Sequence, residues 1–73
     1  MNARFIKVDG IRLRRLRRER ALSQHDLSRM TGVAFATISR LETGKQDAQP
    51  QTIRKLAEAL SVEPKELMKG EEW

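Results

Sequence analysis

Two glycines, Gly32 and Gly44, constrain the possible folds of this sequence most, because each follows a short segment with helical periodicity. Glycine adopts the left-handed backbone conformation that ends a helix at little cost. The first segment begins after Ser23, which with Asp26 three residues later is close to a capping box in which the shorter Asp replaces the usual Glu or Gln. The sequence therefore predicts a helix that begins at this box, runs through Leu27 and ends at Gly32.

The second segment runs from Phe35 to Thr43 and places Ile38 and Leu41 on one face, with Gly44 after its last residue. The two short helices would meet across a turn of about three or four residues that contains a glycine, and two helices joined in this way form a helix-turn-helix motif. We expect this motif to dominate the structure of the chain.

A basic segment, Ile11 to Arg20, precedes the motif. Its apolar residues Leu13 and Leu16 share one helical face, and Arg17 falls on that same inward face. An arginine that points inward needs a carboxylate partner, because burial of an unpaired charge is costly. The segment is therefore predicted to be a helix whose Arg17 pairs with an acidic residue elsewhere in the chain.

Two further helices are predicted after the motif. The first spans Pro50 to Leu60, where proline fits the first helical position and apolar residues recur at helical spacing. The second is short and starts at Pro64, with Leu67 and Met68 pointing inward. These segments supply apolar faces that must pack against the earlier helices.

The N-terminal segment differs, since Phe5, Ile6 and Val8 are good strand formers. We expect a short extended arm whose apolar residues are exposed. A chain of 73 residues buries enough surface for one small domain only. The predicted organisation is an N-terminal arm at 1–9, an all-α domain of five helices at 10–69 and an acidic C-terminal tail at 70–73.

The absence of some residue types excludes several classes of protein. The chain has no cysteine and a single histidine, His25, so zinc fingers and other metal sites are not expected, and no cofactor is implied. No paired carboxylate cluster, no nucleophile beside a histidine and no phosphate-binding glycine loop is found, so we do not expect an enzyme. With no apolar stretch of membrane length and no signal peptide, we expect a cytoplasmic protein without membrane contacts.

The charge is unevenly distributed along the chain. The formal net charge is +5, and residues 1–20 hold eight basic side chains against two acidic ones, whereas residues 61–73 hold four acidic side chains against two basic ones. A localised basic surface is expected of a nucleic-acid-binding protein, because neutralised phosphates release their counterions. The same charge is compatible with a well-solvated basic helix, so charge alone leaves both interpretations open.

A set of residues in the middle of the chain resembles a known family in order and spacing. They are Leu16, Arg17, Leu22, Ser23, Gln24, Leu27, Gly32, Val33, Ile38, Ser39, Leu41, Glu42, Gly44, Lys45, Leu56, Ala57 and Leu60. The pattern is similar to that of phage repressors and Cro proteins, the xenobiotic-response-element family of helix-turn-helix DNA-binding domains. The resemblance implies a lambda-repressor-like fold of five helices, with the third in the major groove of double-stranded DNA, and a homodimer on a near-palindromic operator.

The sequence departs from the family pattern in three places. Ser28 stands where alanine is usual, Ala48 and Gln49 replace a proline and a serine before the fourth helix, and residues 34–36 replace polar base-contacting side chains. Serine is nearly as small as alanine and can bond its hydroxyl to the helix backbone. The second departure predicts a weaker helix cap. The third makes base contacts at the start of the third helix the hardest to assign.

Candidate base contacts lie on the outward face of the third helix. At about 100° per residue, Ala36, Arg40 and Thr43 fall opposite the inward side, with Ser39 at its edge. Arg40 is the strongest candidate, since its guanidinium can bond guanine O6 and N7 together; a phosphate contact is the alternative. Ala36 can offer a methyl group to thymine, and Ser39 a hydroxyl to a base or a phosphate. For Phe35, core packing and a thymine contact remain equally open.

Phosphate contacts are expected near helix N-termini, where free N–H groups and the helix dipole favour anions. The resemblance implies this role for Gln24, Thr43 and Lys45, and we expect it of Thr37 as well. Ordinary turn and capping chemistry is a compatible alternative for these residues. His25, near the start of the second helix, is expected to be solvated or close to a phosphate.

Glu42 projects close to the inward face of the third helix. With Arg17 it resembles the structural ion pair of the family, which would hold the first helix against the third. If the pair is deeply buried, removal of one partner strands the other charge at a cost of about 3–5 kcal/mol.

These observations lead to the hypothesis of a sequence-specific DNA-binding transcriptional regulator, with repression as the expected effect, that binds an inverted-repeat operator as a homodimer. The dimer surface stays open between the fifth-helix region, Glu63 to Met68, and the apolar arm. We favour a contribution from the arm, because exposed apolar residues are costly in water. The alternative function is that of an antitoxin or accessory factor whose main role is to bind a partner protein.

Overall fold

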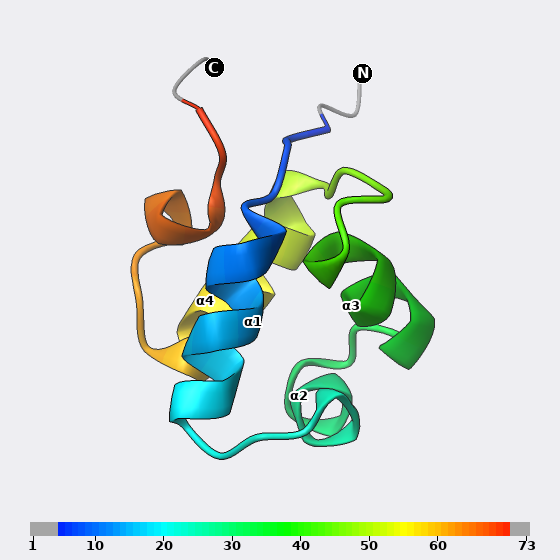
Figure 1. Cartoon of the computed structure of the whole chain (residues 1–73), viewed down its shortest axis with the longest axis vertical. Coiled ribbons are helices and arrows are strands. Elements are labelled where there is room, and N and C mark those ends of the chain that lie inside the picture. The colour runs from blue at the N-terminus through cyan, green and yellow to red at the C-terminus, as the bar shows by residue number, and fades with distance from the viewer. Residues whose placement is uncertain (1–4, 71–73) are drawn as a thin grey trace.

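The computed structural model describes residues 5–70 and has an all-α fold (Figure 1). Its elements are α1 (Gly10–Glu19), α2 (Gln24–Thr31), α3 (Phe35–Glu42), α4 (Pro50–Leu60) and a final 3-10 helix, η1 (Pro64–Leu67). The first residues of the expected arm and most of the acidic tail lie outside the described residues. Within the described part, no helix is long and apolar enough to cross a membrane.

The expected lambda-repressor-like arrangement of short helices is confirmed, with one difference in the fifth element. This element is a single 3-10 turn, in which the N–H of Glu66 bonds three residues back to the carbonyl of Glu63. A four-residue segment that begins with proline leaves room only for such i to i−3 bonds. The turn still buries Leu67 completely, as the apolar pattern predicted.

The ends of the helices follow from local sequence. Ser23 Oγ accepts a 2.9 Å hydrogen bond from the N–H of Asp26, and the Asp26 carboxylate accepts one of 2.9 Å from the N–H of Ser23, so the shorter side chain completes the capping box. Gly32 ends α2 at φ 78°, in the left-handed region. The Gln49 side chain makes no capping bond to α4, which confirms the weaker cap.

Side-chain hydroxyls hold the turn between α2 and α3. Ser28 Oγ donates to the carbonyl of Val33 at 2.6 Å, and Thr31 Oγ1 accepts a 3.1 Å bond from the N–H of Val33. The expectation that Ser28 bonds the backbone of its own helix is therefore wrong, because the turn brings the Val33 carbonyl within reach. These bonds fix the direction in which α3 leaves α2.

The core lies where the helices meet, and large side chains from every element are fully buried: Leu13, Leu27, Ile38, Leu41, Ile53, Leu56, Leu60 and Leu67. Burial of such a side chain stabilises a fold by about 1.5–3 kcal/mol relative to exposure. α2 packs against both α3 and α4, while α1 packs against α3 and η1. The inner side of α3 is therefore firmly supported by α1 and α2.

Gly10 sets the distance between α1 and α3. A Cβ atom at this position would collide with the backbone carbonyl oxygens of Leu41 and Glu42, at the C-terminal end of α3. Glycine permits this close approach because it has no side chain. The positive N-terminal end of the α1 dipole thus meets the negative C-terminal end of α3, which is a favourable arrangement.

The described part of the N-terminal arm packs on the domain itself. Ile6 pairs with Ala48 through two backbone hydrogen bonds of 2.7 and 2.9 Å, and Val8 forms an isolated bridge with Met68. Val8 is only 7% exposed and Ile6 is partly buried, whereas Phe5 is 60% exposed. The expectation that all three apolar residues are exposed is wrong for Val8 and Ile6, because the loop before α4 and the end of η1 cover them.

Candidate nucleic-acid interface

A buried ion pair joins α1 to α3. Arg17 Nε donates to Glu42 Oε2 at 2.6 Å and Arg17 Nη2 donates to Glu42 Oε1 at 3.0 Å. Both residues are buried, and Arg17 Nη1 also donates to the carbonyl of Leu22 at 2.8 Å, in the segment before α2. The bond to Glu42 raises the pKa of Arg17, although burial alone would lower it. Arg17 therefore stays charged, and its bonds to Glu42 hold the C-terminal end of α3 in place.

Gln24 extends this network to the N-terminus of α2. Its Nε2 donates to Glu42 Oε1 at 3.0 Å, and the residue is half-buried. One of the two amide hydrogens is used in this bond, which leaves one for another acceptor. The side chain expected to contact a phosphate is thus held at the first position of α2 by the same carboxylate that Arg17 binds.

The outward face of α3 carries side chains that the helical periodicity predicted for it. Ala36 and Arg40 are exposed, Ser39 is half-buried, and Ile38 and Leu41 are buried beneath them. The Arg40 guanidinium makes no hydrogen bond or ion pair with any described residue. The guanidinium can therefore bind a ligand without breaking an internal interaction.

The residues expected to contact phosphates differ in their internal bonds. The Thr43 hydroxyl donates to the carbonyl oxygens of Ser39 and Arg40, at 3.1 and 3.2 Å, and so caps the end of α3. Lys45 is exposed, while Thr37 is half-buried on α3. Lys45 therefore presents its charge at the C-terminal end of α3, with no ion-pair partner among the described residues. The Thr43 hydroxyl hydrogen and N–H are both used at the helix end.

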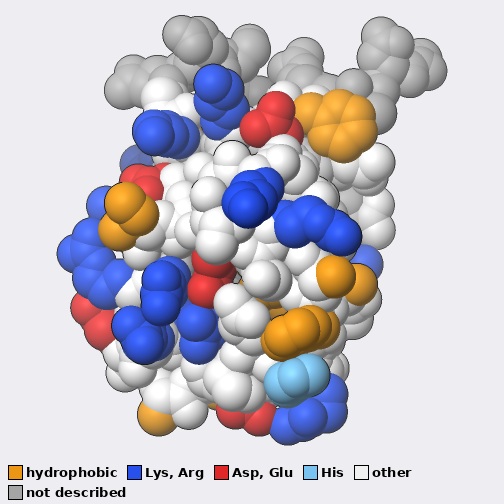
Figure 2. All heavy atoms as spheres, turned by 45° about the vertical axis from the view of Figure 1, so that its right-hand side comes forward, with side chains coloured by type: hydrophobic (Ala, Val, Ile, Leu, Met, Phe, Trp, Pro, Cys, Tyr) orange, Lys and Arg blue, Asp and Glu red, His pale blue; other side chains and the backbone are white. Residues whose placement is uncertain are grey.

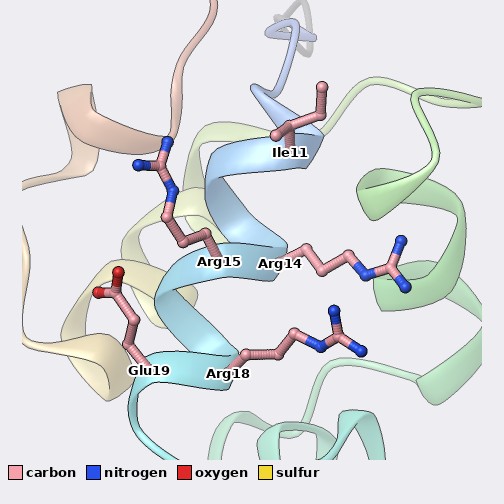
Figure 3. A pocket seen from close by; sticks show the side chains of 5 residues that line it. All are labelled: Ile11, Arg14, Arg15, Arg18 and Glu19. Atoms are coloured by element: carbon pink, nitrogen blue, oxygen red, sulfur yellow. The ribbon is translucent and has the colours of Figure 1, made fainter.

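Two exposed arginines on α1 enlarge the basic surface beside α3. Figure 3 shows that Arg14 and Arg18 extend from the side of α1 on which α3 lies, whereas Arg15 and Glu19 extend from the opposite side. Neither Arg14 nor Arg18 has an ion-pair partner among the described residues, in contrast to Arg12, which lies 3.3 Å from a carboxylate oxygen of Glu66. Sequence analysis did not single them out.

The signal for these two arginines was present in the sequence. Arg14 and Arg18 are four residues apart, so they share one helical face, and the charge of residues 1–20 indicated a basic surface in this region. What the sequence lacked was the position of α1 relative to α3, which depends on the close approach at Gly10.

His25 and Phe35 form a stacked pair across the turn between α2 and α3. Their ring centroids are 4.1 Å apart and the rings are 7° from parallel. Phe35 is 41% exposed and His25 is exposed, so Phe35 is not part of the buried core. Figure 2 shows the histidine, in pale blue, against an apolar group on a face where basic side chains are frequent.

The chain is similar to known helix-turn-helix proteins in sequence and in structure. The HTH-type transcriptional repressor RghR of Bacillus subtilis (strain 168) is 48% identical over 60 residues, which cover 81% of this chain and 44% of the relative, so the chain spans less than half of that protein. The restriction-modification controller protein C.AhdI from Aeromonas hydrophila has a crystal structure with a TM-score of 0.75 and 38% identity, covering 78% of this chain and 86% of that one.

A further solved structure is that of the P22 c2 repressor in complex with a synthetic operator. It has a TM-score of 0.78 and 31% identity, and the match covers 85% of this chain and 94% of that one. The family model described as Helix-turn-helix matches residues 13–67, which include all five helical elements except the first three residues of α1. The chain therefore belongs to the helix-turn-helix family.

Proposed function

We propose that this chain is the DNA-binding unit of a transcriptional repressor and that it acts by binding, without catalysis. The observation that carries the proposal is the outward face of α3. Its Arg40 guanidinium is exposed and has no partner among the described residues, while the inner side of the helix is held by the buried pair of Arg17 and Glu42. A helix presented in this way fits the major groove of double-stranded DNA, which is wide enough to admit it.

Base contacts in this proposal come from the outward face of α3. Arg40 donates two hydrogen bonds to guanine O6 and N7, a pairing worth about 1–3 kcal/mol of discrimination. The Ala36 methyl group contacts a thymine methyl, and Ser39, which is half-buried, reaches a base or phosphate at the edge of the contact. Phe35 lies at the start of the helix, where it points along the groove.

Phosphate contacts surround the groove on two sides. Gln24, with its remaining amide hydrogen, and the N-terminus of α2 bind one strand. Lys45 and Thr37 bind near the ends of α3, and Thr43 does so by turning its hydroxyl hydrogen from the α3 carbonyl oxygens to a phosphate oxygen. Arg14 and Arg18 add two charges on the side of α1, because both are exposed beside α3 and lack ion-pair partners among the described residues.

The working form is proposed to be a homodimer on an inverted repeat. One short helix contacts only a few base pairs, and two copies related by a two-fold axis would contact two half-sites about 34 Å apart. The packing of Val8 and Ile6 on the domain reduces the energetic reason for pairing through the arm to the exposed Phe5. We therefore place the dimer contact at the region from Glu63 to Met68.

A salt series tests the proposed function. Gel shifts with random duplex DNA should give an affinity whose logarithm falls linearly with the logarithm of salt concentration, with a slope of roughly −0.9 per phosphate neutralised. Selection from a random duplex pool should then give an inverted repeat, and sedimentation should find two copies on it. Absence of binding at low salt would contradict the proposal and favour a protein partner, as for an antitoxin or accessory factor.

A further inference from the structure

The stacked rings of His25 and Phe35 are placed where they do little for the core. Phe35 keeps 41% of its surface exposed on a face that otherwise carries charged and small side chains. Aromatic side chains are enriched in binding surfaces, where they serve as anchors. The ring is also held in a defined orientation, at 4.1 Å from the imidazole and 7° from parallel to it.

We propose that Phe35 contacts the 5-methyl group of a thymine at one defined position of each half-site and that His25 is the positioning residue that holds the ring for this contact. The proposal rests on the proposed DNA-binding function and adds one specificity-determining residue on α3 and one on α2.

The chemistry of the major groove supports thymine as the target. Thymine is the base that presents a methyl group in this groove, and apolar side chains discriminate it by contact with that group. At the start of α3, Ala34, Phe35 and Ala36 are all exposed and none of them carries a hydrogen-bonding side chain. This part of the helix can therefore distinguish bases by apolar contact, and Phe35 offers the largest apolar surface.

The role of His25 follows from its position on a different helix. It is the second residue of α2, and α2 is fixed to α3 by the Gln24 bond to Glu42 and by the hydroxyl bonds of the turn. Contact with the imidazole covers one face of the Phe35 ring and restricts its rotation in the free protein. The conformational entropy of the ring is then already lost before DNA binds, which increases the affinity of the contact.

Helix geometry gives the location of the thymine. Phe35 and Arg40 are five residues apart, which corresponds to about 7.5 Å along the axis of α3. Successive bases of one DNA strand are about 3.4 Å apart. The two side chains also point about 140° apart around the helix, so the thymine contacted by Phe35 should lie about two base pairs or more from the base pair that depends on Arg40.

The test uses the operator selected from a random duplex pool, with each thymine of a half-site replaced in turn by deoxyuridine, which lacks only the methyl group. Affinities are measured by fluorescence anisotropy for the wild type, Phe35→Ala, His25→Ala and His25→Phe. For the wild type, replacement of the thymine at the position given above should lower the affinity about fourfold per half-site, which is the value of one buried methyl group. Phe35→Ala should abolish that loss, His25→Ala should reduce it, and His25→Phe should retain it.

This readout separates base contact from a structural role. If the stack only held α2 against α3, its loss would weaken binding to thymine and deoxyuridine operators equally and would leave their ratio unchanged, which would overturn the proposal. Any position that depends on Ala36 should stay sensitive in Phe35→Ala and serves as an internal control. Insensitivity of the wild type at every position would overturn the inference while leaving salt-dependent operator binding intact, whereas failure to bind any duplex DNA would overturn the proposed function with it.

Discussion

Arg17→Ala tests the buried network that holds α3. In the folded protein Glu42 accepts three hydrogen bonds, two from Arg17 and one from Gln24, and its side chain is 2% exposed. Truncation of Arg17 leaves the carboxylate with Gln24 alone, in a place that water barely reaches. Removal of one partner from a buried ion pair costs about 3–5 kcal/mol, since the remaining charge is buried without compensation.

A loss of this size is a large part of the stability of the domain. Small proteins have about 0.05–0.15 kcal/mol of unfolding free energy per residue, and for domains of this size each 1 kcal/mol shifts the melting temperature by about 4–8 °C. Circular dichroism melts should therefore show melting temperatures of Arg17→Ala and Glu42→Ala that are roughly 12–40 °C below that of the wild type. Arg18→Ala is the matched control, because Arg18 is exposed and forms no ion pair with a described residue. Equal shifts for Arg17→Ala and Arg18→Ala would refute the reasoning.

The double variant Arg17→Met, Glu42→Leu sharpens the test. It removes both charges and fills their space with apolar side chains, so no buried charge is left without a partner. The double variant should melt above either single alanine variant. The single variants Arg17→Met and Glu42→Leu complete the double-mutant cycle. If the destabilisation of the double variant equalled the sum of these two single losses, the residues would not be coupled, and the ion pair could not be what holds α1 against α3.

Three further predictions concern other parts of the domain. Gly10→Ala should lower the melting temperature, because the added methyl group meets backbone carbonyls of α3 that cannot move aside; a melt equal to the wild type would contradict the close approach. The pKa of Asp26 should lie below its ordinary value of 3.8, mainly because its carboxylate accepts a hydrogen bond from the backbone N–H of Ser23. The carboxylate therefore stabilises the fold above pH 3.8, and this stabilisation is lost as the pH falls through the lower pKa of the folded state. NMR titration of the Asp26 carboxyl carbon measures this pKa. Arg14→Ala and Arg18→Ala together should lower the salt slope of DNA binding by about two without changing base preference, and an unchanged slope would remove them from the interface.

Much of the fold could be predicted from local signals. The capping box at Ser23 and the glycine at position 32 fixed the ends of α2, and the helical spacing of apolar residues identified the core side chains. The ion pair could be anticipated because Arg17 shares a face with Leu13 and must find a carboxylate. The helix ends and the apolar faces depend on residues a few positions apart in the sequence. The ion pair follows because a buried charge requires a partner.

The remaining features depend on how distant segments meet. The pairing of Ile6 with Ala48 needs the position of the loop before α4, and no local pattern specifies it. The stack of His25 on Phe35 depends on the angle between α2 and α3, which the hydroxyl bond of Ser28 helps to set. The sequence alone therefore could not decide whether Phe35 packs in the core or faces the DNA groove.

The central claim, that α3 contacts bases in the major groove, is tested most directly by affinities for the selected operator and for its complete set of single base-pair variants. The comparison needs the wild type, Arg40→Ala and Lys45→Ala. Arg40→Ala should lose discrimination at one base pair per half-site, by about 1–3 kcal/mol, and keep it elsewhere. Lys45→Ala should weaken binding to all sequences about equally and lower the salt slope by about one. If Arg40→Ala instead weakened specific and random DNA by the same factor, Arg40 would bind only phosphate, and the proposed major-groove contact of α3 would be contradicted.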